Sequence, residues 1–339
     1  MPLKYYIHDG PFELECGGVL PELTIAYHTY GHFTGDNAVW VCHALTANSD
    51  VADWWPHTVE AGRFLDPAHR FVVCANIIGS HYGTTGPLHI NPATGDAWYG
   101  GFPFVTIRDM ARAHLLLARH LGVERVQAAI GSSIGGFQAL EMALLAPEFV
   151  GRLVLIATSA KTSPWCIAFN ESQRMAIEAD ATWDERAPDA GRAGMMTARS
   201  IGLLSYRGSS GYNATQAERD GEEGRMEDFR AASYQRYQGE KLARRYNAYS
   251  YHLITRAFDS HNVGRGRGDV ERVLATVSCP TLVVGITTDI IFPVEEQRFL
   301  CDRIHGARLE ILESEFGHDG FLVEHDKLNT IIKPFIEKK

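Results

Sequence analysis

Short apolar stretches alternate with helical patterns over much of the chain. Strand-like runs, most of them continuous apolar segments suited to strands buried on both faces, occur at residues 38–42, 71–76, 126–130, 153–157, 281–286 and 308–312. Helical patterns follow several of these runs, and a last helix is expected over about 321–336. Strand–helix alternation of this kind predicts an α/β fold with a mostly parallel sheet and helices on both faces.

One helix has clear signals at both ends. Thr106 precedes it with Asp109 three residues on, a variant of the capping box, and Gly122 follows, so the helix is expected over 107–121. His114 lies in the apolar stripe of this helix. We therefore expect it to be a packed core histidine.

The N-terminal part favours antiparallel structure. Residues 12–16 and 23–30 both alternate between apolar and polar side chains, and Gly17-Gly18 between them can supply a turn. These segments are expected to form a hairpin at the edge of the sheet.

Residues 161–268 have a different character from the rest. Strand-like runs disappear, and the composition favours helices near 171–179, 190–204, 226–237 and 241–258, with a turn-rich stretch at 207–211. We interpret 161–268 as a helical cap inserted into a core formed by 1–160 and 269–339.

Composition and charge exclude several classes of function. The chain has 339 residues and a formal net charge of -9, which argues against a nucleic-acid or anionic-membrane surface. The first residues lack the apolar core of a signal peptide, and no run is long and apolar enough to cross a bilayer, so a cytoplasmic protein is expected. Six scattered cysteines without a Cys-x-x-Cys pair predict reduced thiols. The absence of His-Glu-x-x-His argues against a metal site.

Three residues with complementary chemistry follow predicted strands. Ser133 lies in Gly131-x-Ser133-x-Gly135, where small neighbours allow a strand to turn abruptly into a helix and expose the hydroxyl. Asp289 and His318 follow the last two strands, and the order Ser, Asp, His is that of α/β-hydrolase triads. His318 would take the proton of Ser133, and Asp289 would orient and stabilise the imidazole.

The oxyanion of such a reaction requires backbone donors. The residue after the nucleophile supplies one, the N–H of Ile134, and the loop after the strand at 38–42 supplies the other, for which Leu45 is the best candidate. Each triad member also has an ordinary structural explanation: a tight helix start for Ser133, a helix cap for Asp289 and a loop histidine for His318. Their joint occurrence in this order favours catalysis.

Several separate motifs together resemble the homoserine O-acetyltransferase family. They are His43-Ala44-Leu45-Thr46, Gly83-Thr84-Thr85-Gly86-Pro87, Gly131-x-Ser133-x-Gly135-Gly136-x-Gln138-Ala139-Leu140-Glu141, Phe169-Asn170-Glu171-x-Gln173-Arg174, Tyr237-Gln238-Gly239-x-Lys241, Gly264-Arg265-Gly266-Arg267-Gly268 and Gly317-His318-Asp319-Gly320-Phe321-Leu322. The resemblance covers nearly the whole chain. It implies transfer of an acetyl group from acetyl-CoA, a substrate rather than a bound cofactor, to the hydroxyl of L-homoserine, as a step towards methionine.

The resemblance also implies an amino-acid pocket. Arg199, Tyr206 and Asp319 match the family's acceptor residues, and Thr46 belongs to the matching loop motif. A guanidinium suits the carboxylate of an amino acid and an aspartate suits its ammonium group. Family habit, together with the apolar and aromatic content of the cap, suggests a homodimer.

Several alternatives stay open at this point. The chain has Ser132 and His81 where the family commonly has glycine and cysteine, which leaves succinyl donors and serine acceptors possible. A carboxylesterase or amidase on the same fold is the main enzymatic rival, and a relative that only binds a ligand is a second. The Gly264–Gly268 stretch is interpreted as a flexible basic hinge, with contacts from Arg265 or Arg267 to CoA phosphates as the alternative.

Overall fold

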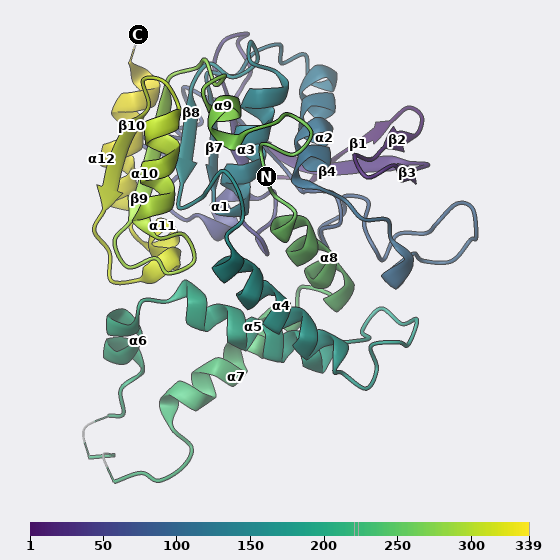
Figure 1. The fold of residues 1–339 in the computed structure, drawn as a ribbon, viewed down its shortest axis with the longest axis vertical. Helices are drawn as coiled ribbons and strands as arrows, with labels where there is room; N and C mark the ends of the chain where they lie inside the picture. The colour runs from purple at the N-terminus through teal and green to yellow at the C-terminus, as the bar shows by residue number, and fades with distance from the viewer. Residues whose placement is uncertain (220, 223, 339) are drawn as a thin grey trace.

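An eight-stranded sheet forms the centre of the molecule (Figure 1). The computed structural model describes residues 1–338 except 220 and 223. In spatial order the strands are β1 (Lys4–His8), β4 (Leu23–Tyr30), β6 (Phe71–Ala75), β5 (Ala38–Cys42), β7 (Ala128–Ser132), β8 (Leu153–Ile156), β9 (Thr281–Ile286) and β10 (Arg308–Leu312). The pairs β1–β4 and β4–β6 are antiparallel and the other neighbours are parallel. The predicted mostly parallel sheet is confirmed.

The N-terminal hairpin is not the one expected from the sequence. A two-stranded ribbon, β2 (Phe12–Glu13) with β3 (Val19–Leu20), stands apart from the main sheet. Residues 23–30 form β4, which pairs with β1 on one side and β6 on the other. The prediction that 12–16 pair with 23–30 is wrong. β4 is buried along almost its whole length, and both of its edges are hydrogen-bonded to other strands.

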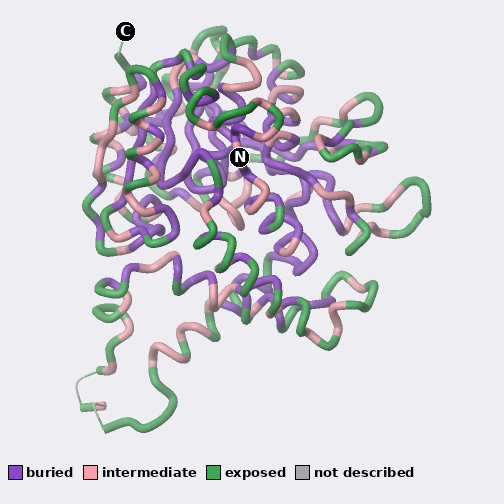
Figure 2. The backbone as a smooth tube through the Cα atoms, in the orientation of Figure 1, coloured by how far each residue is buried: buried purple, intermediate pink, exposed green. Residues whose placement is uncertain are grey.

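Alternate residues of the strands face two separate apolar layers. Trp40 of β5 points towards a layer with α2 (Ile107–His120), α3 (Ile134–Leu145) and α10 (Val294–Arg303), whereas its neighbour Val39 points towards the other layer. That second layer contains α1 (Val51–Trp54), α11 (Gly320–Val323) and α12 (His325–Glu337). Figure 2 shows the buried residues concentrated along the sheet between these helices. The single helix expected over about 321–336 is therefore two helices, α11 and α12.

Helix α2 forms as its sequence predicts. The backbone N–H of Asp109 donates to Thr106 Oγ1 at 3.2 Å, and the backbone N–H of Thr106 donates to Asp109 Oδ2 at 3.0 Å, which completes the capping box. His114 is buried on the inner face, with Nε2 3.0 Å from Oε1 of Gln138 on α3. Its expected role as a packed core histidine is confirmed.

In the part of the chain that the structure describes, five helices follow β8, and a sixth, shorter helix leads into the next strand of the sheet. They are α4 (Pro164–Glu178), α5 (Arg192–Tyr206), α6 (Ser209–Gln216), α7 (Arg230–Ala243) and α8 (Ala248–Asp259), and α9 (Val270–Leu274) precedes β9. Figure 1 shows α4, α5 and α7 grouped below the sheet, and α5 packs against both of the others. Helix α6 begins inside the stretch expected to be a turn, because Gly208 and two serines at its start resemble turn chemistry.

Two further features concern the lengths of the helices and the state of the cysteines. Within the part of the chain that the structure describes, each helix is either too short or too polar to cross a lipid bilayer. All six cysteines are free, and Cys42, Cys74, Cys166 and Cys279 are buried. This arrangement agrees with the prediction of reduced thiols.

Candidate active site

Ser133 lies at the sharp corner between β7 and α3. Its φ of 57° and ψ of -128° fall in a region that residues with side chains rarely adopt. The corner is held from both sides, because the Ser133 N–H donates to the Ile156 carbonyl at 2.9 Å and the Thr158 hydroxyl donates to the Ser133 carbonyl at 2.8 Å. The predicted strand–turn–helix geometry of the nucleophile elbow is present.

Three glycines around Ser133 make this corner possible. A Cβ at Gly131 would collide with the backbone of Gly135, and a Cβ at Gly135 would collide with the carbonyl of Cys42. A Cβ at Gly136 would lie 2.6 Å from the Thr158 side chain. Glycine is therefore required at all three positions, and the close approach at Gly135 brings the start of α3 against the end of β5.

Asp289 and His318 form a buried pair at the ends of β9 and β10. Asp289 Oδ2 lies 2.6 Å from His318 Nδ1, and Asp289 Oδ1 accepts hydrogen bonds from the backbone N–H groups of Ile291 at 2.8 Å and Phe292 at 3.0 Å. His318 belongs to a short 3-10 turn, η2 (Gly317–Asp319). With Nδ1 bound by Asp289, Nε2 remains for the hydroxyl of Ser133, which lines the same cavity as His318.

The environment of His318 favours its protonated form. Burial alone would lower its pKa, but the charge of Asp289 and the hydrogen bond to it outweigh burial, and Asp319 adds a smaller effect of the same sign. The net pKa of His318 is raised above its ordinary value. A raised pKa suits a group that accepts a proton from a weakly acidic hydroxyl and later returns it.

The two predicted oxyanion donors are free. Neither the backbone N–H of Leu45 nor that of Ile134 donates to any other residue that the structure describes. The collision that any side chain at Gly135 would cause shows how closely the loop after β5 approaches the start of α3. Two unsatisfied N–H groups at such a junction suit an oxyanion.

His43 holds the loop that carries Leu45. Its Nδ1 lies 2.8 Å from the Ala44 carbonyl, and its Nε2 lies 3.2 Å from the backbone N–H of Ile77. These partners require Nδ1 to carry the proton and Nε2 to accept, which is the neutral imidazole. Burial lowers the pKa of His43 to about 4, so it stays neutral and keeps both bonds.

A cavity of about 430 Å³ unites most of the predicted site residues. Those that line it are Leu45, Thr46, Ser133, Arg199, Tyr206, His318 and Asp319. Asp289 does not line the cavity but contacts His318, which does, and the side chain of Ile134 is buried outside the cavity. The structure thus brings together residues from the sheet ends and from α5.

The side chain of Arg199 has no anionic partner. Its guanidinium lies 5.6 Å from the centre of the Tyr206 ring, and it makes no ion pair or hydrogen bond with another described residue. The Tyr206 ring lies near His318, with ring centres 5.9 Å apart and the ring planes tilted by 41°. A half-buried arginine left unpaired beside a catalytic cluster is suited to bind a carboxylate.

Three further cations at the cavity are missed by the sequence analysis. Arg207, Lys241 and Arg245 line it, alongside Asp53. Arg245 is already engaged, donating to the Thr46 carbonyl at 2.6 Å and to the Tyr82 hydroxyl. The spacing of Lys241 and Arg245, four residues apart, is the one signal that could have indicated a shared face.

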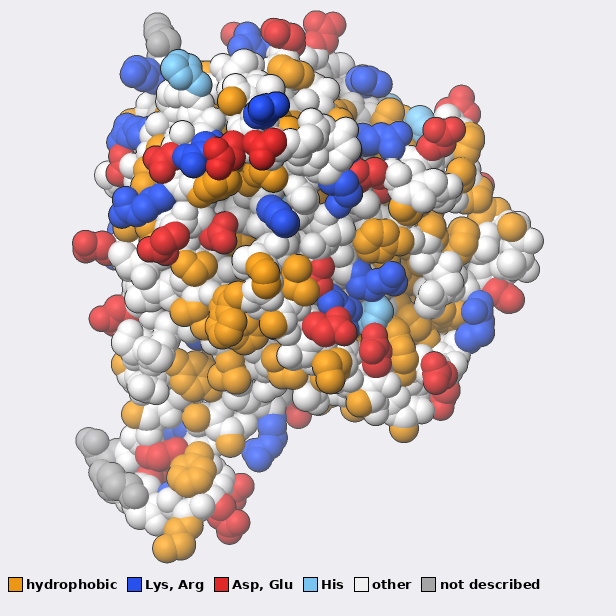
Figure 3. Space-filling view, viewed as in Figure 1, with side chains coloured by type: hydrophobic (Ala, Val, Ile, Leu, Met, Phe, Trp, Pro, Cys, Tyr) orange, Lys and Arg blue, Asp and Glu red, His pale blue; other side chains and the backbone are white. Residues whose placement is uncertain are grey.

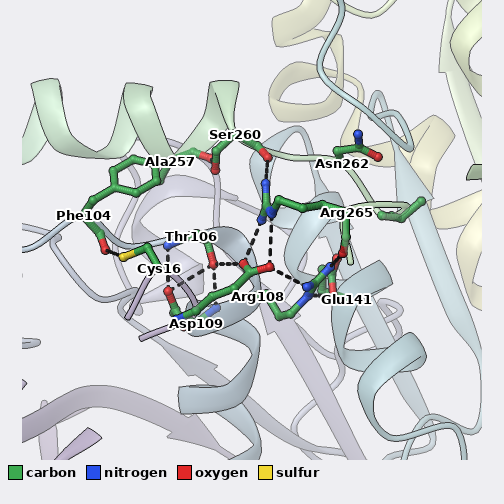
Figure 4. Close-up of polar contacts among 12 residues, drawn as sticks. Cys16, Phe104, Thr106, Arg108, Asp109, Glu141, Ala257, Ser260, Asn262 and Arg265 are labelled. Carbon is green, nitrogen blue, oxygen red and sulfur yellow. Dashed lines mark hydrogen bonds and ion pairs between the residues drawn. The ribbon is translucent and has the colours of Figure 1, made fainter. Parts of the chain in front are cut away.

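The arginines of the Gly264–Gly268 stretch are fully engaged elsewhere. Arg265 binds Glu15 in two-point fashion, at 3.1 and 2.8 Å, and Arg267 binds Glu141 at 2.9 and 2.7 Å. Arg108 donates to the Arg265 carbonyl at 2.9 Å and to Glu141 at 3.3 Å, and Figure 4 shows these side chains converging. Because both arginines are bound to carboxylates, the arrangement does not favour phosphate contacts, and the stretch is anchored by ion pairs. Its role as a flexible hinge stays a prediction.

No metal-binding cluster of three or more His, Cys, Asp or Glu side chains occurs among the residues with described positions. Among the described residues that line the cavity, Asp53 and Asp319 carry carboxylates and His318 is the histidine. The predicted site residues are a serine, a histidine–aspartate pair and backbone donors.

Comparison with known proteins defines first the fold class and then the family. Residues 37–325 match the family model described as alpha/beta hydrolase fold. A homoserine O-acetyltransferase from Cyclobacterium marinum is 43% identical over 324 residues, covering 95% of this chain and 92% of that protein. The chain belongs to the homoserine O-acetyltransferase family, a family of acyltransferases within the α/β-hydrolase fold.

Solved structures share the fold over almost the whole chain. The crystal structure of homoserine O-acetyltransferase from Bacillus anthracis superposes with a TM-score of 0.92 at 21% identity, covering 100% of this chain and 99% of that one. An acetylester hydrolase from Corynebacterium glutamicum superposes with a TM-score of 0.87 at 22% identity, covering 99% of this chain and 96% of that one. Transferases and ester hydrolases thus share this fold, so the site has to distinguish between them.

Proposed function

We propose that this protein transfers the acetyl group of acetyl-CoA to the hydroxyl of L-homoserine through an acetyl-Ser133 intermediate. The observation that carries the proposal is the unpaired Arg199 facing the same cavity as Ser133 and Asp319. An esterase needs a triad and an oxyanion hole but has no use for an unpaired guanidinium and a carboxylate on the wall of the same cavity. An amino-acid acceptor needs both.

The first half-reaction acylates the enzyme. His318 Nε2 takes the proton of Ser133 while Oγ attacks the thioester carbonyl, and the N–H groups of Leu45 and Ile134 stabilise the oxyanion. Asp289 stabilises the imidazolium through its 2.6 Å contact with Nδ1. The intermediate collapses by breaking the carbon–sulfur bond, and the proton on His318 passes to the departing thiolate.

The second half-reaction transfers the acetyl group to the acceptor. Arg199 binds the carboxylate of homoserine, Asp319 binds its ammonium group, and Tyr206 and Thr46 complete the pocket wall. His318 takes the proton of the homoserine hydroxyl as its oxygen attacks the acetyl carbonyl, and Ser133 leaves with that proton. The products are O-acetylhomoserine and the free enzyme, which places the reaction in methionine biosynthesis.

Steady-state kinetics test the proposal. Release of the CoA thiol is followed with acetyl-CoA or succinyl-CoA as donor and with homoserine, serine or water as acceptor. We expect parallel double-reciprocal plots with acetyl-CoA and homoserine as the preferred pair. Preferred use of succinyl-CoA or serine would assign the chain to another activity of this family, and equal rates with homoserine and water would assign a hydrolase.

The arrangement of the molecule supports three further parts of the proposal. We infer that 161–268 is a cap over a core made of 1–160 and 269–339, and that the cap excludes water from acetyl-Ser133. We also infer a cytoplasmic homodimer formed through the cap helices. Large apolar side chains are exposed there, as Figure 3 shows around α4; they include Trp165, Ile167, Met175, Leu204, Phe229 and Tyr237.

A further inference from the structure

The end of α5 and the start of α6 lie directly on the loop that carries His318. A Cβ at Gly208 would collide with the Glu315 carbonyl, and a Cβ at Gly211 would lie 2.7 Å from the same oxygen. From the other side, a Cβ at Gly317 would lie 2.5 Å from the Gly208 nitrogen. Backbone therefore packs on backbone at this contact, which we call the glycine seam (Gly208, Gly211 and Gly317).

Arg207 lies on the glycine seam and faces Asp319. Its Nε lies 3.1 Å from Asp319 Oδ2, and its Nη2 donates to the Tyr234 hydroxyl of α7 at 3.3 Å. The side chains of Arg207 and Asp319 are 27% and 12% exposed, so the pair is only partly screened by solvent. Arg207 is the one cation paired with Asp319 among the described residues.

The contact between these two side chains is an ion pair without a hydrogen bond. The Nε–H group of Arg207 is buried and is not directed at the carboxylate, despite the short distance. The Asp319 carboxylate accepts no hydrogen bond from any residue with a described position. Arg207 thus compensates the charge of Asp319 but leaves its lone pairs available to a ligand.

Asp319 also acts on His318, its neighbour in the chain. Its negative charge adds to that of Asp289 in raising the pKa of His318. The rings of Tyr206, Phe292 and Phe321 surround the imidazole. The other titratable groups that line the cavity are Asp53, Cys166, Arg199, Lys241 and Arg245.

We propose that Arg207 is a positioning residue that holds the Asp319 carboxylate at the cavity wall and balances its charge beside His318 while no amino acid is bound. This inference rests on the proposed binding of the acceptor ammonium by Asp319. During acylation by the thioester no ammonium is present, and Arg207 compensates Asp319. During transfer to the acceptor, the ammonium group takes the free lone pairs. His318 thereby works next to a compensated carboxylate in both half-reactions.

The test measures the protonation of His318 in the free enzyme. The variants are Arg207→Met, Arg207→Lys, Asp319→Asn and the Arg207→Met/Asp319→Asn double variant. Two readouts are recorded: the acidic limb of kcat/KM for hydrolysis of p-nitrophenyl acetate, which needs only the triad, and an NMR titration of ¹³C-labelled His318, which needs no turnover. The second readout remains informative even if the proposed transferase function fails.

We expect Arg207→Met to move the acidic limb and the NMR midpoint up by about 0.5 pH unit, because an uncompensated Asp319 stabilises the imidazolium. Asp319→Asn should move both down, and the double variant should behave like Asp319→Asn, since Arg207 acts through Asp319. Arg207→Lys should restore most of the wild-type profile.

Gly211→Ala is the matched control for a purely structural effect. It disturbs the glycine seam without changing any charge, so it should lower the melting temperature and leave the titration of His318 unchanged. The inference is overturned if Arg207→Met produces no shift, if its shift persists in the Asp319→Asn background, or if Gly211→Ala moves the titration equally.

Discussion

Two groups of arginines in this molecule differ in how many of their guanidinium groups' hydrogen-bonding positions already have partners inside the protein. Arg265 and Arg267, on the return from the helical segment to the sheet, each hold a carboxylate in two-point fashion. Among the described residues, Arg199 at the cavity has no anionic partner, and Arg207 forms one ion pair with Asp319 and donates to the Tyr234 hydroxyl. The same residue type thus fixes the fold in one region and stays available for a ligand in the other.

This contrast separates effects on stability from effects on chemistry. Glu141 of α3 is 2% exposed and receives both Arg108 and Arg267, so its charge is compensated inside the protein. Asp319 is compensated by one arginine and has room for a second cation. Substitutions in the ion-pair network are expected to lower stability and spare catalysis, whereas substitutions at the cavity are expected to lower catalysis and spare stability.

The largest effect is expected from Asp289→Asn in the active site. The amide leaves the local packing intact but favours the wrong tautomer of His318, so kcat should fall by about 10⁴-fold. Circular dichroism should show a melting temperature close to wild type. A fall of less than about tenfold would remove Asp289 from the triad.

Glu141→Gln should produce the reverse pattern. Two arginines then share a neutral partner in a buried position, and we expect the free energy of unfolding to fall by about 3 kcal/mol. Denaturant unfolding measures this loss of stability. The kcat of the folded enzyme should stay within about twofold of the wild-type value, whereas a barrier raised by about 1.4 kcal/mol would lower it tenfold. A large loss of kcat with unchanged stability would place the ion-pair network in the catalytic machinery.

Arg199→Met should affect only the acceptor. Loss of a charged hydrogen-bond donor should lower kcat/KM for homoserine by about 10²-fold, which corresponds to about 3 kcal/mol. Acylation of Ser133 by acetyl-CoA, followed in single-turnover mass spectrometry, should be nearly unchanged. Equal loss of both half-reactions would contradict the assigned role.

The smallest effect is expected from Glu310→Gln, the surface counterpart of Glu141→Gln. Glu310 pairs with Arg308 on β10, where the side chain of Arg308 is 60% exposed and that of Glu310 is 31% exposed. Its loss should change the free energy of unfolding by less than about 0.5 kcal/mol, because solvent screens such pairs. An effect as large as that of Glu141→Gln would contradict the distinction drawn between buried and exposed pairs.

The strands of the sheet and the turn that carries Ser133 are predictable because the sequence signals for them are local. A Cβ at Gly131 would collide with the backbone of Gly135, four residues on, so this small residue is required by the turn from strand to helix itself. The capping box of Thr106 and Asp109 is likewise complete within four residues. Such features survive folding because tertiary context does not compete with them.

The remaining features depend on contacts between distant segments. The alternation of residues 23–30 shows a strand but not that its partners are β1 and β6. The sequence places Arg207 in a turn-rich stretch and Lys241 at the start of an expected helix, and only the packing of α5 and α7 turns them to the cavity. Likewise, the ion pairs of Arg265 and Arg267 involve Glu15 and Glu141, more than 100 residues away.

The most direct test of the account is intact-protein mass spectrometry after mixing with acetyl-CoA. We predict a mass increase of one acetyl group, located on Ser133 by peptide mapping and absent in Ser133→Ala. Added L-homoserine should remove it faster than water or L-serine does, with O-acetylhomoserine as the product. Absence of an adduct with any acyl-CoA, or an adduct that water removes as fast as homoserine does, would contradict the central claim that Ser133 carries an acetyl group to an amino-acid hydroxyl.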